Sequence, residues 1–338
     1  MRRPLLSLLL VALAMLLAAC GGGSDSANKA RPEQDATLVL DFTPNAAHAG
    51  IYSAVERGFD DAEGVNLRVQ VPGNSTDAVK LLLGGRAAFA VMDIHDLALA
   101  RDQGRDIVGV MAIVQRPLAA ILTSADVKSP RDLEGRKVGV TGLPSDDAVL
   151  ASIVSGAGGD PERVDKVTIG FNAVPALLGG KVAGATAFWN VEGLALQQAR
   201  PGSNAFRVDD YGAPAYPELV LVTSRARLDE EPDLVHALVR ALVRGYGVTI
   251  HDPASSLSDL QARVRGLDRQ QLEDQLDALG PALTPSGGGA VGTLDPATLE
   301  AWARWETRFG IVETKPDIAQ AFDTSVVPAS GATSDDPS

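Results

Sequence analysis

Residues 37–71 read TLVLDFTPNAAHAGIYSAVERGFDDAEGVNLRVQV, and this stretch decides the fold class. The apolar run over residues 37–42 predicts a strand, which Pro44 and Asn45 interrupt. Apolar residues then recur at helical spacing, and residues 67–71 form a second strand. A strand, a helix and a second strand in this order predict a βαβ unit in a largely parallel sheet.

The alternation of short apolar strands and amphipathic helices continues outward from this unit. Further strands are expected in residues 89–92, 132–140, 167–169, 185–188 and 219–222. From Pro232 onward the pattern becomes helical, with apolar stripes. Helices are expected over residues 232–243, 260–279 and 295–309. No long linker interrupts the pattern, so we predict two lobes joined by two short crossings, near residues 118–122 and 221–224.

The first twenty residues predict a signal peptide followed by a lipid anchor. An apolar run over residues 5–19 follows two arginines, and it is shorter than the roughly 20 residues that a membrane-spanning helix needs. The run closes in LAAC, which resembles a bacterial lipobox, and Cys20 is the single cysteine of the chain. We therefore predict lipidation of Cys20 and no intrachain disulfide. An ordinary signal peptide with a coincidental cysteine is the alternative.

The charge of the chain restricts its partners. The formal net charge is −13 at pH 7. Nucleic-acid binding requires clustered lysines and arginines, so we predict no nucleic-acid partner. The same acidity disfavours sulfate, nitrate or phosphate as the ligand, and no local basic cluster is evident in the sequence.

Five segments resemble solute-binding proteins of the NMT1/THI5-like group. Residues 40–52 (LDFTPNAAHAGIY) resemble the opening of these proteins, and residues 82–92 and 132–140 are similar to two later segments. Residues 189–193 (WNVEG) and 216–218 (YPE) are similar to the branch that binds thiamine-pyrimidine precursors. The resemblance implies a lipoprotein that serves an ABC importer, of the SsuA/THI5 type.

The resemblance also implies an architecture. It is the type II periplasmic-binding-protein fold, an α/β fold of two lobes with mixed, mostly parallel sheets joined by two hinge crossings. The expected division is a signal peptide (1–19), the lipidated cysteine and a flexible tether (20–36), the first part of lobe 1 (37–120), lobe 2 (121–222), a helical return to lobe 1 (223–326) and a disordered tail (327–338). The expected protein is an extracytoplasmic monomer held at the cell membrane by its lipid.

Three aromatic residues are candidates for stacking on a heteroaromatic ligand. Such a ligand needs flat apolar faces and a few oriented donors and acceptors. Phe42, Trp189 and Tyr216 stand at strand ends or in loops, in a chain with only 4% aromatic residues. Core packing is the alternative for each of them.

Six polar residues are the expected hydrogen-bonding partners of the ligand: Asn45, His48, Asp93, Asn190, Glu192 and Glu218. Asn45 offers a donor and an acceptor on one amide, and a carboxylate accepts hydrogen bonds from an exocyclic amine. The alternatives are structural. Asn45 is a turn residue, Asp93 a helix cap, His48 a packed residue at a helix start, and the two glutamates are solvated surface carboxylates.

The sequence offers no catalytic residue, cofactor site or metal site. Yeast-type members of the group make the pyrimidine with a cysteine-rich iron-binding motif, which this chain lacks. His95, His236 and His251 do not have metal-like spacing. No phosphate-binding glycine loop or serine nucleophile motif is present.

We therefore predict a binding protein that traps a small heteroaromatic nutrient, a thiamine-pyrimidine precursor, by closing its lobes on it. It would then dock on an ABC permease that is driven by a separate ATPase. Riboflavin and a sulfonate, taurine or nitrate are alternative ligands. A pyrimidine-synthesis enzyme and a lipoprotein sensor are alternatives of other classes.

Overall fold

The computed structural model describes residues 34–72, 77–285 and 289–328. These residues belong to one compact unit. The predicted signal peptide, the lipidation of Cys20, most of the tether and most of the tail lie outside the described residues. Among the helices that are described, none has both the length and the apolar character needed to cross a bilayer.

The first sheet has the strand order β2-β1-β3-β10-β4. β1 (Gln34–Val39) runs parallel to β2 (Val65–Gln70) and to β3 (Phe89–Asp93). β10 (Leu219–Ser224) runs antiparallel to β3 and to β4 (Ile107–Val114). The parallel pair of β1 and β2 confirms the predicted βαβ unit.

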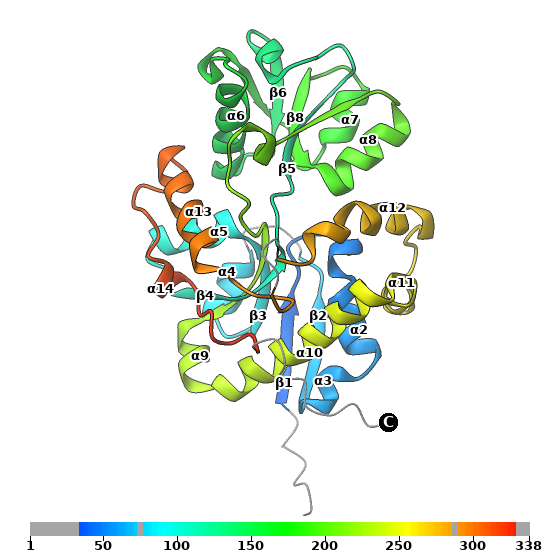
Figure 1. Ribbon diagram of the computed structural model, residues 1–338, viewed down its shortest axis with the longest axis vertical. Coiled ribbons are helices and arrows are strands. Elements are labelled where there is room, and N and C mark those ends of the chain that lie inside the picture. The colour runs from blue at the N-terminus through cyan, green and yellow to red at the C-terminus, as the bar shows by residue number, and fades with distance from the viewer. Residues whose placement is uncertain (1–33, 73–76, 286–288, 329–338) are drawn as a thin grey trace, which may run out of the picture. The chain divides into compact units, whose positions relative to one another are not determined.

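The second sheet has the strand order β7-β6-β8-β5-β9. β6 (Lys137–Val140) runs parallel to β7 (Asp165–Thr168) and to β8 (Gly184–Phe188). β5 (Ala119–Thr123) runs antiparallel to β8 and to β9 (Asn204–Arg207). Each sheet is mixed, as predicted, but neither is mostly parallel as expected. Half of the pairings are antiparallel, because β5 and β10 each enter their sheet from the other lobe (Figure 1).

The chain crosses between the sheets at residues 115–118 and again at residues 208–218. The first crossing joins β4 to β5, and it overlaps the predicted one only at its end. The second crossing joins β9 to β10, and it lies before the position expected at residues 221–224. The apolar run at residues 219–222 predicted a strand correctly, but this strand belongs to the first sheet.

The helices cover the sheets and include a long C-terminal series. Their bounds are α2 (Ala49–Glu56), α3 (Phe59–Ala62), α4 (Asp77–Leu83), α5 (Ile94–Asp102), α6 (Pro144–Gly156), α7 (Ala173–Leu178), α8 (Leu194–Ala199), α9 (Arg225–Glu230), α10 (Pro232–His251), α11 (Pro253–Arg263), α12 (Arg269–Leu279), α13 (Pro296–Arg308) and α14 (Ile318–Ala321). α10 and α11 pack on α2, and α14 packs on β4, so these helices lie on the first lobe.

One expected helix is divided in two. The helix expected over residues 260–279 is interrupted between α11 and α12, where Gly266 has a φ of 84°. This left-handed conformation favours glycine and ends the helical pattern. Asp268 then caps α12 by accepting a hydrogen bond from the backbone N–H of Gln271 at 2.8 Å.

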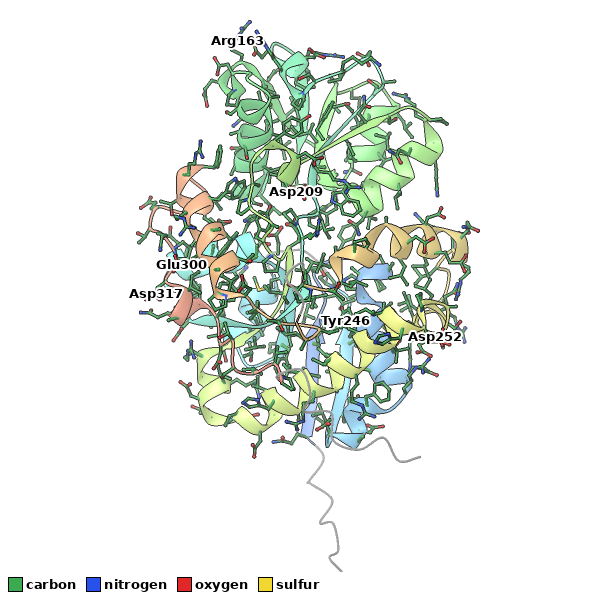
Figure 2. All side chains as sticks on the ribbon, viewed as in Figure 1. Arg163, Asp209, Tyr246, Asp252, Glu300 and Asp317 are labelled. Carbon is green, nitrogen blue, oxygen red and sulfur yellow. The ribbon has the colours of Figure 1, made fainter. Side chains whose placement is uncertain are left out.

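α2 and α10 approach each other most closely at two glycines. A Cβ at Gly245 would lie 2.1 Å from the carbonyl oxygen of Gly50, and a Cβ at Gly50 would lie 2.4 Å from the ring of Tyr246. Tyr246, labelled on α10 in Figure 2, donates a hydrogen bond from its hydroxyl to the carbonyl oxygen of Ala47 at 2.8 Å. The close packing therefore fixes the segment that precedes α2.

Replacing Gly245 by alanine is expected to lower the free energy of unfolding by about 1–3 kcal/mol, because the added methyl meets backbone that has no rotamer to change. Urea unfolding followed by circular dichroism measures the effect. Gly247→Ala is the matched control on the same helix, since its Cβ meets no atom within 4 Å. The control is expected to gain up to about 1 kcal/mol. Equal stabilities of the two variants would show that α2 and α10 can move apart at no cost in free energy.

Candidate ligand-binding site

A cleft lies between the two lobes, and both lobes line it. Its polar and aromatic lining includes Asp41, Phe42, Asn45, Asp93, His95 and Asp96 of the first lobe and Thr141, Ser145, Asp146, Phe171, Phe188, Asn190 and Glu192 of the second. The cleft holds about 1260 Å³ of space, including solvent at its mouth.

Asp41 lies in the loop after β1 and lines the cleft, and a hydrogen bond from His48 orients its carboxylate. Nδ1 of His48 accepts the backbone N–H of Asn45 at 3.1 Å, so Nε2 carries the proton and donates to Oδ1 of Asp41 at 2.8 Å. His48 is fully buried and does not line the cleft. The prediction of His48 as a ligand contact is therefore corrected, because its ring is used to orient Asp41.

Asn45 lines the cleft and also caps η1 (Ala46–His48). Its Oδ1 accepts the N–H of Ala47 at 2.9 Å, and its Nδ2 donates to the carbonyl oxygen of Thr43 at 3.1 Å. Both ends of the amide are thus engaged by the loop. Asn45 is therefore a turn residue, which was the structural alternative, and it also lines the cleft wall.

A π-helical turn, η4 (Trp189–Gly193), follows β8 and turns Trp189 away from the cleft. The indole N–H of Trp189 donates to the carbonyl oxygen of Pro117 at 3.0 Å, and the guanidinium of Arg207 lies 3.8 Å from the ring centroid. Trp189 does not line the cleft. The prediction that it stacks on the ligand is corrected, because the indole is buried beneath Arg207 and bonded to the backbone of Pro117.

The same turn places Asn190 and Glu192, two of the predicted ligand contacts, in the cleft wall. The side chain of Asn190 is 1% exposed, and its Oδ1 has no hydrogen-bond partner among the described residues. A buried acceptor without a partner is costly, so it is expected to be satisfied by a bound molecule. Burial also raises the pKa of Glu192.

Three phenylalanines supply the apolar faces of the cleft. The ring centroids of Phe42 and Phe171 are 5.7 Å apart, although the two rings come from different lobes. Phe171 is 54% exposed, and Phe188 lies at the end of β8. Of these three residues, only Phe42 was predicted from the sequence. The rule that ligands bind beyond the carboxyl ends of strands would have indicated Phe171 after β7 and Phe188 in β8.

The cleft is acidic. Five carboxyl groups line it, those of Asp41, Asp93, Asp96, Asp146 and Glu192. Among the described residues, no lysine and no arginine lines the cleft. Burial raises the pKa of Asp96, and the nearby His95 lowers it in part. The charges of Asp146 and Asp41 raise it further, so that the pKa of Asp96 is about 6. Three of these five residues were missed from the sequence, because carboxylates in loops and on helices also occur as ordinary surface residues.

Tyr216 and Glu218 lie behind the cleft wall, and neither lines it. Both are fully buried. The hydroxyl of Tyr216 is 3.1 Å from Nε2 of His95. Oε2 of Glu218 accepts hydrogen bonds from the backbone N–H groups of Leu118 and Ala119, where the first crossing enters β5. Their prediction as ligand contacts is corrected, since they hold the crossing and the floor of the cleft.

Asp93 lines the floor of the cleft and caps α5 at the same time. Its Oδ1 accepts the backbone N–H of His95 at 2.8 Å. Burial raises the pKa of Asp93 well above its ordinary value, the neighbouring His95 lowers it, and Glu218 raises it further. The predicted site role and the predicted cap are therefore compatible.

Residues 45–256 match the family model described as NMT1/THI5 like. The chain belongs to this family. A formylaminopyrimidine-binding protein of Halalkalibacterium halodurans is 32% identical over 259 residues, which cover 76% of this chain and 77% of that protein. The riboflavin-binding protein RibY of Chloroflexus aurantiacus is 25% identical over 345 residues, which cover 94% and 96%.

A solved structure of the periplasmic aliphatic sulphonate binding protein SsuA from Escherichia coli has the same fold as this NMT1/THI5-like chain. The TM-score is 0.69 at 14% identity, and the match covers 85% of this chain and 91% of SsuA. The predicted periplasmic-binding-protein fold is confirmed. At this identity the likeness concerns the fold alone, so the ligand must be argued from the cleft.

Proposed function

We propose that the chain is the extracytoplasmic solute-binding component of an ABC importer, and that its ligand is an amine-bearing heteroaromatic of the thiamine-pyrimidine type. One observation carries the choice of ligand. Within the described part of the chain, the cleft combines five carboxyl groups, no basic side chain except His95, and the unpartnered Oδ1 of Asn190. Such a lining calls for a ligand rich in N–H donors.

An aminopyrimidine fits this chemistry, because its exocyclic amine and the adjacent ring nitrogen lie on one edge. Asn190 accepts one N–H of the amine. Glu192 pairs with the same edge, as a carboxylate facing a protonated ring nitrogen or as a carboxylic acid donating to a neutral one. Phe42 and Phe188 offer apolar faces for the flat ring. The similarity to a formylaminopyrimidine-binding protein supports the same ligand class.

The acidic lining argues against sulfonate, taurine or nitrate, because an anionic group requires arginine or lysine at the cleft. Riboflavin is the second candidate, since the match to the riboflavin-binding protein RibY spans nearly the whole chain. A pyrimidine-synthesis enzyme is disfavoured because the cysteine-rich iron-binding motif is absent from the sequence.

Capture works by closure of the lobes. A ligand that touches Asp41 or Asp93 on the first lobe and Asn190 or Glu192 on the second is bound more tightly when the lobes are closed, and this difference in affinity drives closure. The lipid on Cys20 holds the protein near its permease, which raises the frequency of docking.

Isothermal calorimetry on the mature chain tests the proposal with three ligands. 4-Amino-5-hydroxymethyl-2-methylpyrimidine is expected to bind with a Kd of roughly 1 μM or below, riboflavin more weakly, and taurine with no measurable heat. Tight binding of taurine without response to a pyrimidine or a flavin would contradict the ligand class. Mass spectrometry of the pyrimidine released afterwards is expected to show it unaltered, whereas a converted product would indicate an enzyme.

A further inference from the structure

Asp93, His95 and Glu218 form a compact group at the floor of the cleft, which we call the floor triad. Each residue offers one ligand atom, and these atoms all lie within 4.8 Å of one another. Asp93 and His95 line the cleft, whereas Glu218 lies fully buried behind them. The ligand proposed above makes no use of Glu218.

Contacts from behind hold the two carboxylates of the floor triad. The backbone N–H groups of Leu118 and Ala119 bind Oε2 of Glu218, and the backbone N–H of His95 binds Oδ1 of Asp93. Oε1 of Glu218 is buried and has no donor among the described residues, and the side chain of Glu218 is close enough to the Asp93 carboxyl group to share a hydrogen bond with it. A carboxylate oxygen that is fully buried, fixed in place and unpaired requires a cation or a proton.

His95 is oriented in the way that metal-binding histidines are. Its Nδ1 is hydrogen-bonded to Oε1 of the fully buried Glu306. A carboxylate that accepts the Nδ1–H fixes the ring, and such pairs orient imidazole ligands in metal sites. Nε2 would release the proton that it carries in the imidazolium when the ion binds. In this structure Nε2 faces the hydroxyl of Tyr216 at 3.1 Å.

The charge of the buried group is unbalanced. Three carboxyl groups, those of Asp93, Glu218 and Glu306, surround a single imidazole that carries at most one positive charge. Buried charges of one sign are expensive, so the excess must be neutralised. Two occupants could do this: a proton shared by Asp93 and Glu218, or a divalent cation bound to both.

We propose that the floor triad binds one Zn²⁺ ion, with Nε2 of His95 and one carboxylate oxygen each of Asp93 and Glu218 as ligands. One imidazole and two carboxylates form a donor set that suits Zn²⁺, and three protein ligands leave one position for water or a solute. That position faces the cleft, because Asp93 and His95 line it. The ion would also tie the floor of the cleft to the first crossing through Glu218.

Calorimetric titration of the chelator-treated full chain with Zn²⁺ tests this inference. The wild type is expected to bind one Zn²⁺ per chain. Glu218→Gln and Asp93→Asn are each expected to weaken binding by at least ~10–100-fold. Both amides keep an oxygen that accepts the backbone N–H groups, so the fold is retained. Glu313→Gln is the control, since it removes an exposed carboxylate that does not line the cleft, and it is expected to leave Zn²⁺ affinity unchanged.

The titration has two opposing outcomes. Loss of binding in Glu218→Gln and in Asp93→Asn, with retention in Glu313→Gln, supports the site. Absence of saturable Zn²⁺ binding, or equal affinity in all four proteins, overturns it and leaves the shared proton as the occupant. A melting temperature that Zn²⁺ raises in the wild type but not in Glu218→Gln gives an independent readout, which should agree with the titration.

Discussion

Replacing Glu306 by alanine is expected to lower the free energy of unfolding by about 3–5 kcal/mol, which makes this residue a principal support of the first lobe. Glu306 lies on α13, is fully buried, and bonds to His95, which is itself 1% exposed. Burial lowers the pKa of His95, but the charges of Glu306 and Asp93 outweigh this and raise it to about 10. The variant leaves a buried imidazolium without its main partner.

Urea unfolding at pH 7 measures this loss in the free energy of unfolding, and two further variants serve as controls. Glu313→Ala removes an exposed glutamate that lies beyond the same helix, and its effect is expected to stay within about 0.5 kcal/mol. The double variant Glu306→Leu with His95→Phe removes both partners, so it is expected to be more stable than Glu306→Ala alone. A loss below about 1 kcal/mol in Glu306→Ala would mean that the pair is not ionised in the folded protein.

Local patterns were sufficient to predict most elements of this fold. The helix expected over residues 295–309 is found as α13, and Asp295 caps it by accepting the N–H of Thr298 at 2.8 Å. Caps, turn residues and apolar spacing act within a few residues, so the sequence shows them directly. Local sequence does not determine which sheet a strand joins. The run at residues 219–222 predicts a buried strand equally well for either lobe.

The candidate site was predicted in part, for a similar reason. Strand ends are visible in the sequence, and Phe42, Asp93, Asn190 and Glu192 were found at or after such ends. Whether a side chain then faces the cleft depends on the turn that follows. The π-helical turn after β8 sends Trp189 inward, and no local signal distinguishes this turn from an ordinary helix start. The floor triad joins Asp93 and His95 to a residue far along the chain, so spacing could not reveal it.

Replacing Asn190 by leucine is expected to weaken binding of the aminopyrimidine by ~10–100-fold, because Oδ1 is the acceptor that a ligand N–H would satisfy. Oδ1 has no partner among the described residues, so the exchange removes an unpaired buried acceptor at nearly constant volume. The free energy of unfolding without ligand is therefore expected to stay equal or to rise. Calorimetry and urea unfolding on the same preparation measure the two quantities.

The opposite signs of these two effects distinguish a binding residue from a packing residue. If Asn190 only packed the core, the leucine variant would be less stable than the wild type and would bind the ligand as before. Glu192→Gln is expected to weaken binding to a similar extent, since a charged hydrogen bond contributes about 1.5–3 kcal/mol. Glu162→Gln, an exposed glutamate of the same lobe, is the matched control and is expected to bind normally. Unchanged affinity in both Asn190→Leu and Glu192→Gln would place the ligand elsewhere in the cleft, because these side chains are the polar contacts that η4 contributes.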